Sequence, residues 1–451
     1  MTGSVPSDNP ARGRGLILAA PASGSGKTLV TSALLRHLRD RGMRVAAAKA
    51  GPDYIDPTFH AAASGGICIN LDVWAMRPAT LAGLVGALEA AGSLVLCEGV
   101  MGLFDGTGPD GETGSTAELA RVTGWPVVLV VDARRQGTSV AALVAGFARH
   151  DPAVPLAGVI FNRVAGPGHR ALLDGAMARH LPEIPCLGAL PPDAELVLPE
   201  RHLGLVPAGE HAAAETVIAR AAALVGAGLG VDRLVALTRP SVLAGAAPVA
   251  PLPPLGQRIA VARDDAFLFA YPAVLEGWRG QGAELSLFSP LADEMPDPAA
   301  DAIYLPGGYP ELHAARLAAA GCFRAGLQQA AASGTAIYGE CGGYMVLGEA
   351  LTDAEGRVHR MAGLLPLATS FAERRLHLGY RAATLLGESP LGRSGARFRG
   401  HEFHYATIVS AGGDAERLFA LEDASGSDLG PSGLRLGSVA GSFIHLIDRA
   451  D

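Results

Sequence analysis

The chain has 451 residues, of which 49% are hydrophobic and 18% are charged, and its formal net charge is −8. This length predicts two domains, and the apolar composition excludes extensive disorder. The acidic balance disfavours nonspecific nucleic-acid binding, which needs a basic face. The apolar run "WPVVLVVDA" is too short to span a bilayer and is typical of a buried strand, so no membrane partner is expected.

The cysteines and the first residues predict a cytoplasmic protein. The number of cysteines is odd, their spacings are wide, and no C-x-x-C occurs, which argues against both a disulfide framework and a zinc site. Residues 1–14 contain no apolar core and are interpreted as a tail, not a signal peptide. The five cysteines are Cys68, Cys97, Cys186, Cys322 and Cys341.

After the tail, short aliphatic runs alternate with helical patterns over residues 15–238. This alternation predicts a doubly wound α/β domain, in which helices cover both faces of a parallel sheet. Ligands bind at the carboxyl ends of the strands in such a sheet. The strands are expected within residues 15–20, 44–51, 93–100, 126–133 and 156–164.

A second α/β domain is predicted after a change of composition. Residues 239–257 are rich in proline and poor in charge, which indicates an extended linker. The strand–helix alternation then begins again and predicts a second doubly wound domain over residues 258–451. Its first strands are expected within residues 258–264, 284–290, 302–308 and 335–341.

The segment "PASGSGKT" is predicted to be a phosphate-binding loop. Gly24 and Gly26 allow backbone N–H groups to converge on phosphate oxygens, and the following helix adds the positive end of its dipole. Lys27 supplies a charge for ATP, and the Thr28 hydroxyl is placed to bind Mg²⁺. Pro21 stands where the usual pattern has its first glycine, which removes turn freedom but no phosphate-facing group.

Acidic residues follow two of the predicted strands. Glu98 ends a buried strand, as does the Walker-B acid that holds Mg²⁺, and Asp53 is predicted to join it as a metal ligand with a catalytic role. Asp105, in the glycine-rich loop after Glu98, is predicted to be catalytic by meeting the substrate. Tyr54 and Asp56 are predicted substrate contacts. For any one of these acids, a helix cap or a solvated loop is the structural alternative.

Asn162 and Arg163 end a further predicted strand at the same edge of the sheet. They are candidates for hydrogen bonding to the base of the nucleotide. Capping of the next helix explains the same residues equally well.

Two longer segments point to a family. "KAGPDYIDPTFH" and "CEGVMGLFDG", together with the variant phosphate loop, resemble the cobyrinic acid and hydrogenobyrinic acid a,c-diamide synthases of corrinoid biosynthesis. The first domain also resembles dethiobiotin synthetase, a P-loop enzyme that phosphorylates a carboxyl-derived group. The family likewise lacks the first glycine of the loop. The resemblance implies that a carboxylate of a corrin-ring acid accepts the phosphate.

In the second domain, "AIYGECGGYMVLG" predicts a nucleophile elbow with Cys341 in the place of serine. The turn would expose the sulfur above the sheet, and the following helix N-terminus is expected to lower the pKa of the thiol. The Gly342 N–H is a candidate oxyanion donor. A second donor is expected at Gly308 in "YLPGGYPE".

A catalytic cysteine needs a base, and three histidines are candidates: His401, His404 and His445. The order of a "PGG" loop, a G-x-C-x-G elbow and a late histidine resembles class I glutamine amidotransferases, which favours His445. Many of these relatives have a glutamate two residues after that histidine, where this chain has Ile447. Cys341 and His445 therefore act either as a dyad or with another acid, such as Asp448 or Glu402.

The sequence is thus interpreted as a glutamine-dependent, ATP-dependent ligase that amidates the a and c carboxylates of hydrogenobyrinic or cobyrinic acid. Its expected partners are the corrinoid acid, ATP and glutamine, with no nucleic acid or membrane, and a homodimer is left open. Related alternatives are cobyric acid synthase and nickel-sirohydrochlorin a,c-diamide synthase. A non-enzymatic P-loop ATPase switch is the alternative of a different class, and an intact Cys341–His445 pair argues against it.

Overall fold

The computed structural model describes residues 13–90, 93–196, 200–201, 204–205, 209, 213–243 and 249–450. Most of the predicted tail and residues 244–248 of the predicted linker lie outside this part. The chain divides into two compact units, the second of which begins at Val249. The second unit also includes the short segment Ala75–Thr80, although the chain belongs to the first unit on both sides of it.

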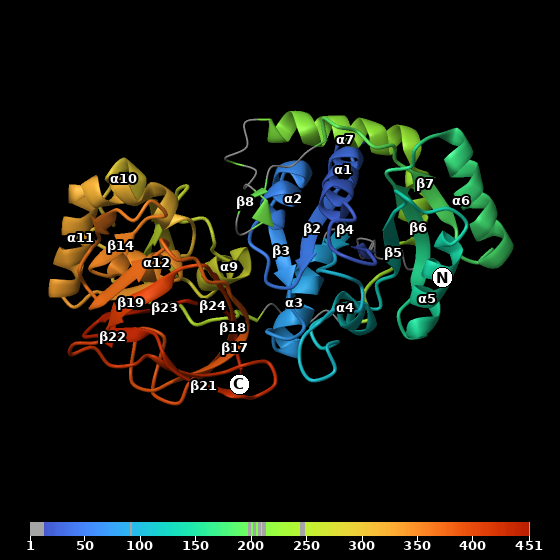
Figure 1. Ribbon diagram of the computed structural model, residues 1–451. Coiled ribbons are helices and arrows are strands. Elements are labelled where there is room, and N and C mark those ends of the chain that lie inside the picture. Colours follow the sequence, from blue (N-terminus) through green and yellow to red (C-terminus); the bar gives the residue numbers. More distant parts are fainter. Residues whose placement is uncertain are drawn as a thin grey trace, which may run out of the picture. The chain divides into compact units, whose positions relative to one another are not determined.

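The first unit is built on a seven-stranded sheet in which every neighbouring pair of strands is parallel (Figure 1). The strand order is β3-β2-β4-β1-β5-β6-β7, so the strand that leads into the phosphate loop lies at the centre. This order confirms the doubly wound fold class. The strands are β1 (Arg14–Ala19), β2 (Val45–Ala50), β3 (Cys68–Leu71), β4 (Leu94–Glu98), β5 (Val127–Asp132), β6 (Leu156–Asn162) and β7 (Cys186–Ala189).

Helices connect these strands, and α1 packs against both α2 and α7. The apolar residues of α1 recur at helical spacing and are buried, which fixes the helix beside the sheet. No helix in the described ranges is long and apolar enough to cross a membrane. The helices are α1 (Lys27–Asp40), α2 (Asp56–Ser64), α3 (Pro78–Glu89), α4 (Thr116–Thr123), α5 (Val140–His150), α6 (Pro167–His180), α7 (Ala214–Gly228) and α8 (Val231–Leu237); β8 (Glu200–Arg201) and β9 (Gly204–Leu205) form a two-stranded ribbon.

The second unit contains a six-stranded sheet with the order β11-β10-β12-β13-β23-β22. All pairs in it are parallel except β22 with β23. The four predicted strands after the linker are confirmed as β10 to β13. The elements of this layer are β10 (Arg258–Ala262), α9 (Pro272–Gly280), β11 (Glu284–Phe288), β12 (Ala302–Leu305), α10 (Ala314–Ala319), α11 (Gly321–Ala332), β13 (Ala336–Glu340), α12 (Gly342–Leu347), β22 (Leu434–Leu436) and β23 (Val439–Ser442), with 3-10 turns at Pro290–Ala292 and Pro310–His313.

Two further sheets, which the sequence analysis did not anticipate, complete the second unit. One is antiparallel with the order β21-β20-β17-β18-β24, and the other has the order β15-β14-β16-β19. Only Phe443 separates β23 from β24, so the chain passes directly from the parallel sheet into an antiparallel one. The strands are β14 (Ala350–Thr352), β15 (Val358–Arg360), β16 (Leu367–Ser370), β17 (His377–Leu385), β18 (Arg397–His404), β19 (Thr407–Ala411), β20 (Phe419–Glu422), β21 (Asp428–Ser432) and β24 (Ile444–Arg449).

The segment Ala75–Thr80 is tied into the second unit through Arg77. Its guanidinium donates to Asp448 Oδ1 at 2.7 and 3.1 Å, and its backbone N–H donates to Asp448 Oδ2 at 2.8 Å. The same guanidinium also donates to the carbonyl of Ala250 at 3.1 Å. Asp448 has no solvent exposure, so this arginine compensates a fully buried carboxylate.

Candidate active site

The predicted phosphate loop connects the end of β1 to the start of α1. Gly24 and Gly26 have φ values of 76° and 90°, a region that favours glycine. Asn162 donates its side-chain N–H to the carbonyl of Ser25 at 2.9 Å, and Arg163 donates to the carbonyl of Gly24 at 2.8 Å. In this structure the two residues predicted to contact the nucleotide base therefore brace the loop from β6.

The loop after β4 lies beside the phosphate loop. Leu103 donates its backbone N–H to the carbonyl of Ala20 at 2.9 Å, which joins the two loops. Within the second loop, Asp105 Oδ2 accepts the backbone N–H of Gly102 at 2.8 Å. Asp105 thus closes a tight turn close to the position where phosphate is expected.

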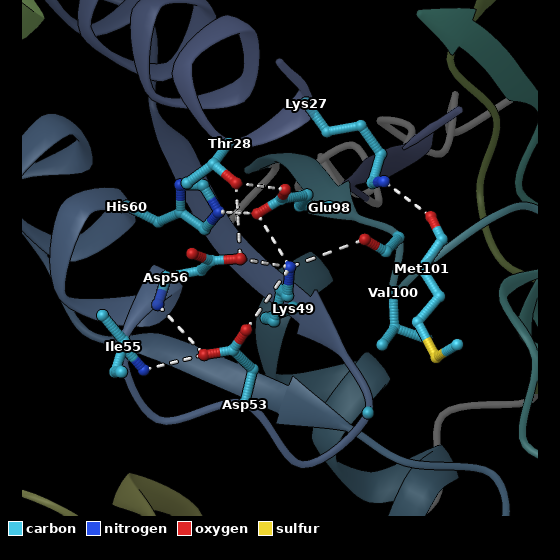
Figure 2. A network of polar contacts seen from close by, with 12 residues as sticks. Lys27, Thr28, Lys49, Asp53, Ile55, Asp56, His60, Glu98, Val100 and Met101 are labelled. Carbon is cyan, nitrogen blue, oxygen red and sulfur yellow. Dashed lines mark hydrogen bonds and ion pairs between the residues drawn. The ribbon is translucent and has the colours of Figure 1, made fainter. Parts of the chain in front are cut away.

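The carboxylate of Glu98 is the centre of a polar network at the ends of β2 and β4 (Figure 2). The Thr28 hydroxyl lies 2.7 Å from Glu98 Oε1 and 3.3 Å from Asp56 Oδ2. Glu98 Oε2 contacts Lys49 Nζ at 3.0 Å and His60 Nε2 at 2.6 Å. Although burial alone would raise the pKa of Glu98, Lys49 and the hydrogen bonds of His60 and Thr28 outweigh it and lower that pKa.

Lys49 and His60 are residues that the sequence reasoning did not single out. They are the first and last residues of "KAGPDYIDPTFH", and both are buried. Lys49 Nζ lies 2.6 Å from Asp56 and 3.8 Å from Asp53, in addition to its contact with Glu98. Burial opposes its charge, but these three acids raise the pKa of Lys49 well above its ordinary value. A lysine at the end of a buried strand was the signal that could have identified it.

Asp53 and Asp56 lie in and directly after the turn that leads from β2 into α2. Asp53 Oδ1 accepts the backbone N–H groups of Ile55 and Asp56 at 2.8 and 3.1 Å, so it closes the turn that leads into α2. Burial and the neighbouring Asp56 raise the pKa of Asp53 to about 7. Asp56, which was predicted to meet the substrate, is the aspartate that contacts Thr28. Tyr54 in the same turn is largely buried, with 9% exposure.

Lys27 points toward the loop after β4. Its Nζ donates to the carbonyl of Met101 at 2.6 Å, and Met101 has a φ of 46°, which presents that carbonyl to the lysine. Burial lowers the pKa of Lys27, while Glu98 acts in the opposite direction. The Met101 carbonyl therefore holds the Lys27 ammonium beside the loop after β4, and phosphate oxygens could take the place of that carbonyl.

Cys341 has the strained backbone expected of a nucleophile elbow, with φ 47° and ψ −101°. It lies between the end of β13 and the start of α12, and its thiol donates to the carbonyl of Phe403 at 3.9 Å. The expected lowering of its pKa does not occur here. The side chain is almost completely buried, and burial raises the pKa of the Cys341 thiol.

His445 on β24 is the histidine that lies beside Cys341. A Cβ atom placed on Gly307 would lie 3.0 Å from His445 Nε2 and 3.3 Å from Cys341 Cβ, so one glycine borders both side chains. Burial, together with the neighbouring His401 and His404, lowers the pKa of His445 to about 3. The imidazole is therefore neutral near pH 7 and can accept a proton.

The two predicted oxyanion donors are neighbours in the structure. A Cβ atom on Gly342 would lie 2.9 Å from the backbone nitrogen of Gly308. The loop that contains Gly308 is held against the elbow, because Gly343 donates its N–H to the carbonyl of Pro306 at 3.1 Å. The close approach requires residues without side chains at these positions.

The two acids suggested as partners of His445 are engaged elsewhere. Asp448 is bound by Arg77, as described above. Glu402 accepts from Arg381 at 2.8 Å and contacts His404 Nε2 at 3.0 Å. Neither arrangement places a carboxylate on the ring of His445.

Known protein families match each half of the chain. Residues 16–206 match the sequence model of the CobQ/CobB/MinD/ParA nucleotide binding domain, and residues 258–451 match that of the CobB/CobQ-like glutamine amidotransferase domain. This chain is also similar to hydrogenobyrinate a,c-diamide synthases. Its sequence identity is 56% to the enzyme of Brucella anthropi, 55% to that of Rhizobium meliloti and 53% to that of Rhodobacter capsulatus. Each alignment covers 96% of this chain and 98–99% of the relative. The chain therefore belongs to the family of hydrogenobyrinate a,c-diamide synthases.

Proposed function

We propose that this protein uses ATP and glutamine to convert the a and c carboxylates of hydrogenobyrinic acid into amides. The observation that carries the proposal is the presence of two separate sets of catalytic groups in one chain. A lysine–carboxylate network adjoins the phosphate loop in the first unit, and a buried cysteine–histidine pair occupies an elbow in the second. Relatives that share both halves are named for this reaction.

In the first unit, a substrate carboxylate oxygen attacks the γ-phosphorus of ATP, and the bond to ADP breaks. Lys27 and the N–H groups of the loop neutralise charge on the transferred phosphoryl group. Lys49 is a second cation at this edge, held in place by Asp56 and Glu98. The acyl phosphate then reacts with ammonia at its carbonyl carbon, and phosphate leaves as the amide forms.

The first unit also offers oxygen ligands that suit Mg²⁺. Glu98 Oε1 and Asp56 Oδ2, both hard donors, each lie within hydrogen-bonding distance of Thr28 Oγ1. These three residues would hold the ion, with Asp53 supporting Asp56 through the turn. When bound, Mg²⁺ supplies positive charge to the phosphate oxygens.

In the second unit, the sulfur of Cys341 attacks the amide carbon of glutamine, and His445 takes the thiol proton and passes it to the leaving nitrogen. Ammonia departs, and water hydrolyses the thioester to glutamate and the free thiol. We assign the oxyanion to the N–H groups of Gly308 and Gly342, which lie on neighbouring loops. Burial favours the neutral thiol of Cys341 and the neutral imidazole of His445. We therefore expect the proton to move from Cys341 to His445 only after glutamine has bound.

The names of the relatives favour hydrogenobyrinic acid, which they state, over cobyrinic acid. The deciding experiment incubates the protein with ATP, glutamine and either acid, and follows the products by mass spectrometry. We expect two successive replacements of OH by NH₂, with stoichiometric release of ADP and glutamate. Glutamate release without any amidated corrinoid would refute the proposed substrate, and no glutamate release would refute the proposed reaction.

A further inference from the structure

The position that supplies the acid in many class I glutamine amidotransferases cannot do so here. Two residues after His445 the chain has Ile447, an aliphatic side chain with 2% exposure. Asp448 and Glu402 are engaged by arginines. The carboxylate that the structure places closest to the ring comes from another element, the residue directly before the nucleophile.

Glu340 ends β13, and its side chain is almost completely buried. Its Oε2 lies 3.9 Å from His445 Nδ1. Its Oε1 accepts the backbone N–H of Leu446 at 3.1 Å, and its Oε2 accepts the hydroxyl of Tyr304 at 2.8 Å. The carboxylate is thus fixed by the residue that follows the histidine and by Tyr304, and the oxygen that accepts from Tyr304 is also the one nearer to the imidazole.

The orientation of the His445 ring determines which of its nitrogens must carry the proton. A Cβ atom on Gly307 would lie nearer to Nε2 than to Nδ1, and Cys341 borders the same glycine. We therefore take Nε2 as the nitrogen that accepts the thiol proton, which requires it to be unprotonated. The proton of the neutral ring must then be on Nδ1, which is the nitrogen that faces Glu340. Burial raises the pKa of Glu340 to about 7. In its ionised form the group favours this tautomer and stabilises the imidazolium that forms after proton transfer. At 3.9 Å the two groups are not hydrogen-bonded in this structure, and the proposed contact requires them to approach when the substrate binds, as catalytic groups often do.

We propose that Glu340 is the positioning residue for His445, completing a Cys341–His445–Glu340 arrangement in which the acid precedes the nucleophile in sequence. This inference rests on the proposed glutamine hydrolysis. Its consequence is that the elbow supplies both the nucleophile and the group that orients the base. The backbone of Phe269 lies close enough to His445 to raise the pKa of the imidazole, and it is the rival for this role.

The test is Glu340→Gln, compared with Tyr304→Phe in the full-length protein. The glutamine amide can keep the bond to Leu446, but it turns an N–H toward Nδ1 and so favours the wrong tautomer. We expect kcat for glutamate release to fall by about 10²–10³-fold while KM for glutamine changes little. Tyr304→Phe removes a bond to the same oxygen but keeps the carboxylate, and should lower kcat by less than about tenfold.

Two measurements separate a positioning role from a structural one. Synthesis driven by ammonium salts should be unchanged in Glu340→Gln, and ¹⁵N NMR of labelled histidines, with His445 assigned from His445→Gln, should show its proton move from Nδ1 to Nε2. A wild-type kcat, or an unchanged tautomer, would overturn the proposal and leave Phe269 as the group that orients the ring.

If Glu340→Gln does not fold, Glu340→Asp decides the matter. It keeps the charge with a shorter reach, so part of kcat and the Nδ1–H tautomer should persist, and an Nε2–H tautomer would refute the role. Failure of the proposed function is distinct, because the wild-type protein would then release no glutamate.

Discussion

Lys49→Met would leave the carboxylates of Asp56, Glu98 and Asp53 without their shared cation. Lys49 has only 3% exposure and lies 2.6 Å from Asp56 and 3.0 Å from Glu98. Removing one partner of a buried ion pair costs about 3–5 kcal/mol, since the other charge is left uncompensated. We expect a loss of this size in the first unit, and a fall of roughly a thousandfold in synthesis with either nitrogen source.

The assay combines thermal unfolding with two activities measured on the same samples. A loss of about 3–5 kcal/mol corresponds to a drop of roughly 6–20 °C in the unfolding midpoint of a unit of this size. Arg36→Gln is the matched control, because it removes a cation whose partners Asp40 and Glu215 are largely exposed. Such surface pairs contribute about 0–1 kcal/mol. Glutamate release should persist in both variants.

The reasoning would be refuted by a Lys49→Met protein that unfolds like the control and still makes amide from ammonium salts. If Lys49→Met keeps its stability but loses synthesis, the three acids become protonated at little cost in free energy, and Lys49 acts in the reaction. Lost stability with retained synthesis would remove Lys49 from the reaction altogether.

Four other outcomes are expected. Cys341→Ser should reduce glutamine-driven synthesis by at least about a thousandfold and spare ammonium-driven synthesis; loss of both in a folded protein would contradict the division of labour. Gly307→Ala should lower glutamate release by about 10²-fold, because its methyl group would press on His445; a wild-type rate would contradict the geometry. Asp105→Asn should slow one amidation more than the other, so that a monoamide accumulates on mass analysis; equal slowing would assign Asp105 to its turn with Gly102. Chelation of divalent cations should stop ADP formation but not glutamate release, and unchanged ADP formation would argue against a metal at Thr28.

The fold was largely predictable because its central strands are continuous apolar runs that end in polar loops. β2, β4, β5 and β6 fall within the predicted ranges, and β1 begins one residue before its range, at Arg14. The edge strands β3 and β7 were missed, since four residues carry too little periodicity to be distinguished from a loop. The other two sheets of the second unit, one antiparallel and one mixed, were missed because their strands contain glycine and charged residues that obscure the strand pattern.

The site was predictable where a local motif carries the chemistry, as at Lys27 and Cys341. The site was less predictable at Asp53 and Asp56. Which of these two acids faces Thr28 depends on the conformation of the turn, which the sequence does not specify. The expected lowering of the thiol pKa rested on the helix N-terminus alone, while burial, which acts in the opposite direction, is visible only in the packed structure. The contact of Glu340 with His445 joins residues far apart in the chain, which no spacing rule connects.

The contact between Arg77 and Asp448 bears on how the chain can be made and divided. Its two residues are 371 positions apart, so during synthesis the segment Ala75–Thr80 must wait until β24 has emerged before its place in the fold exists. A gene split within residues 244–248 would not yield an intact second half, because Asp448 would be buried without its arginine. The cost of such an uncompensated charge is about 3–5 kcal/mol. Because the segment Ala75–Thr80 belongs to the second unit, the fold favours a single continuous polypeptide over two separately encoded subunits.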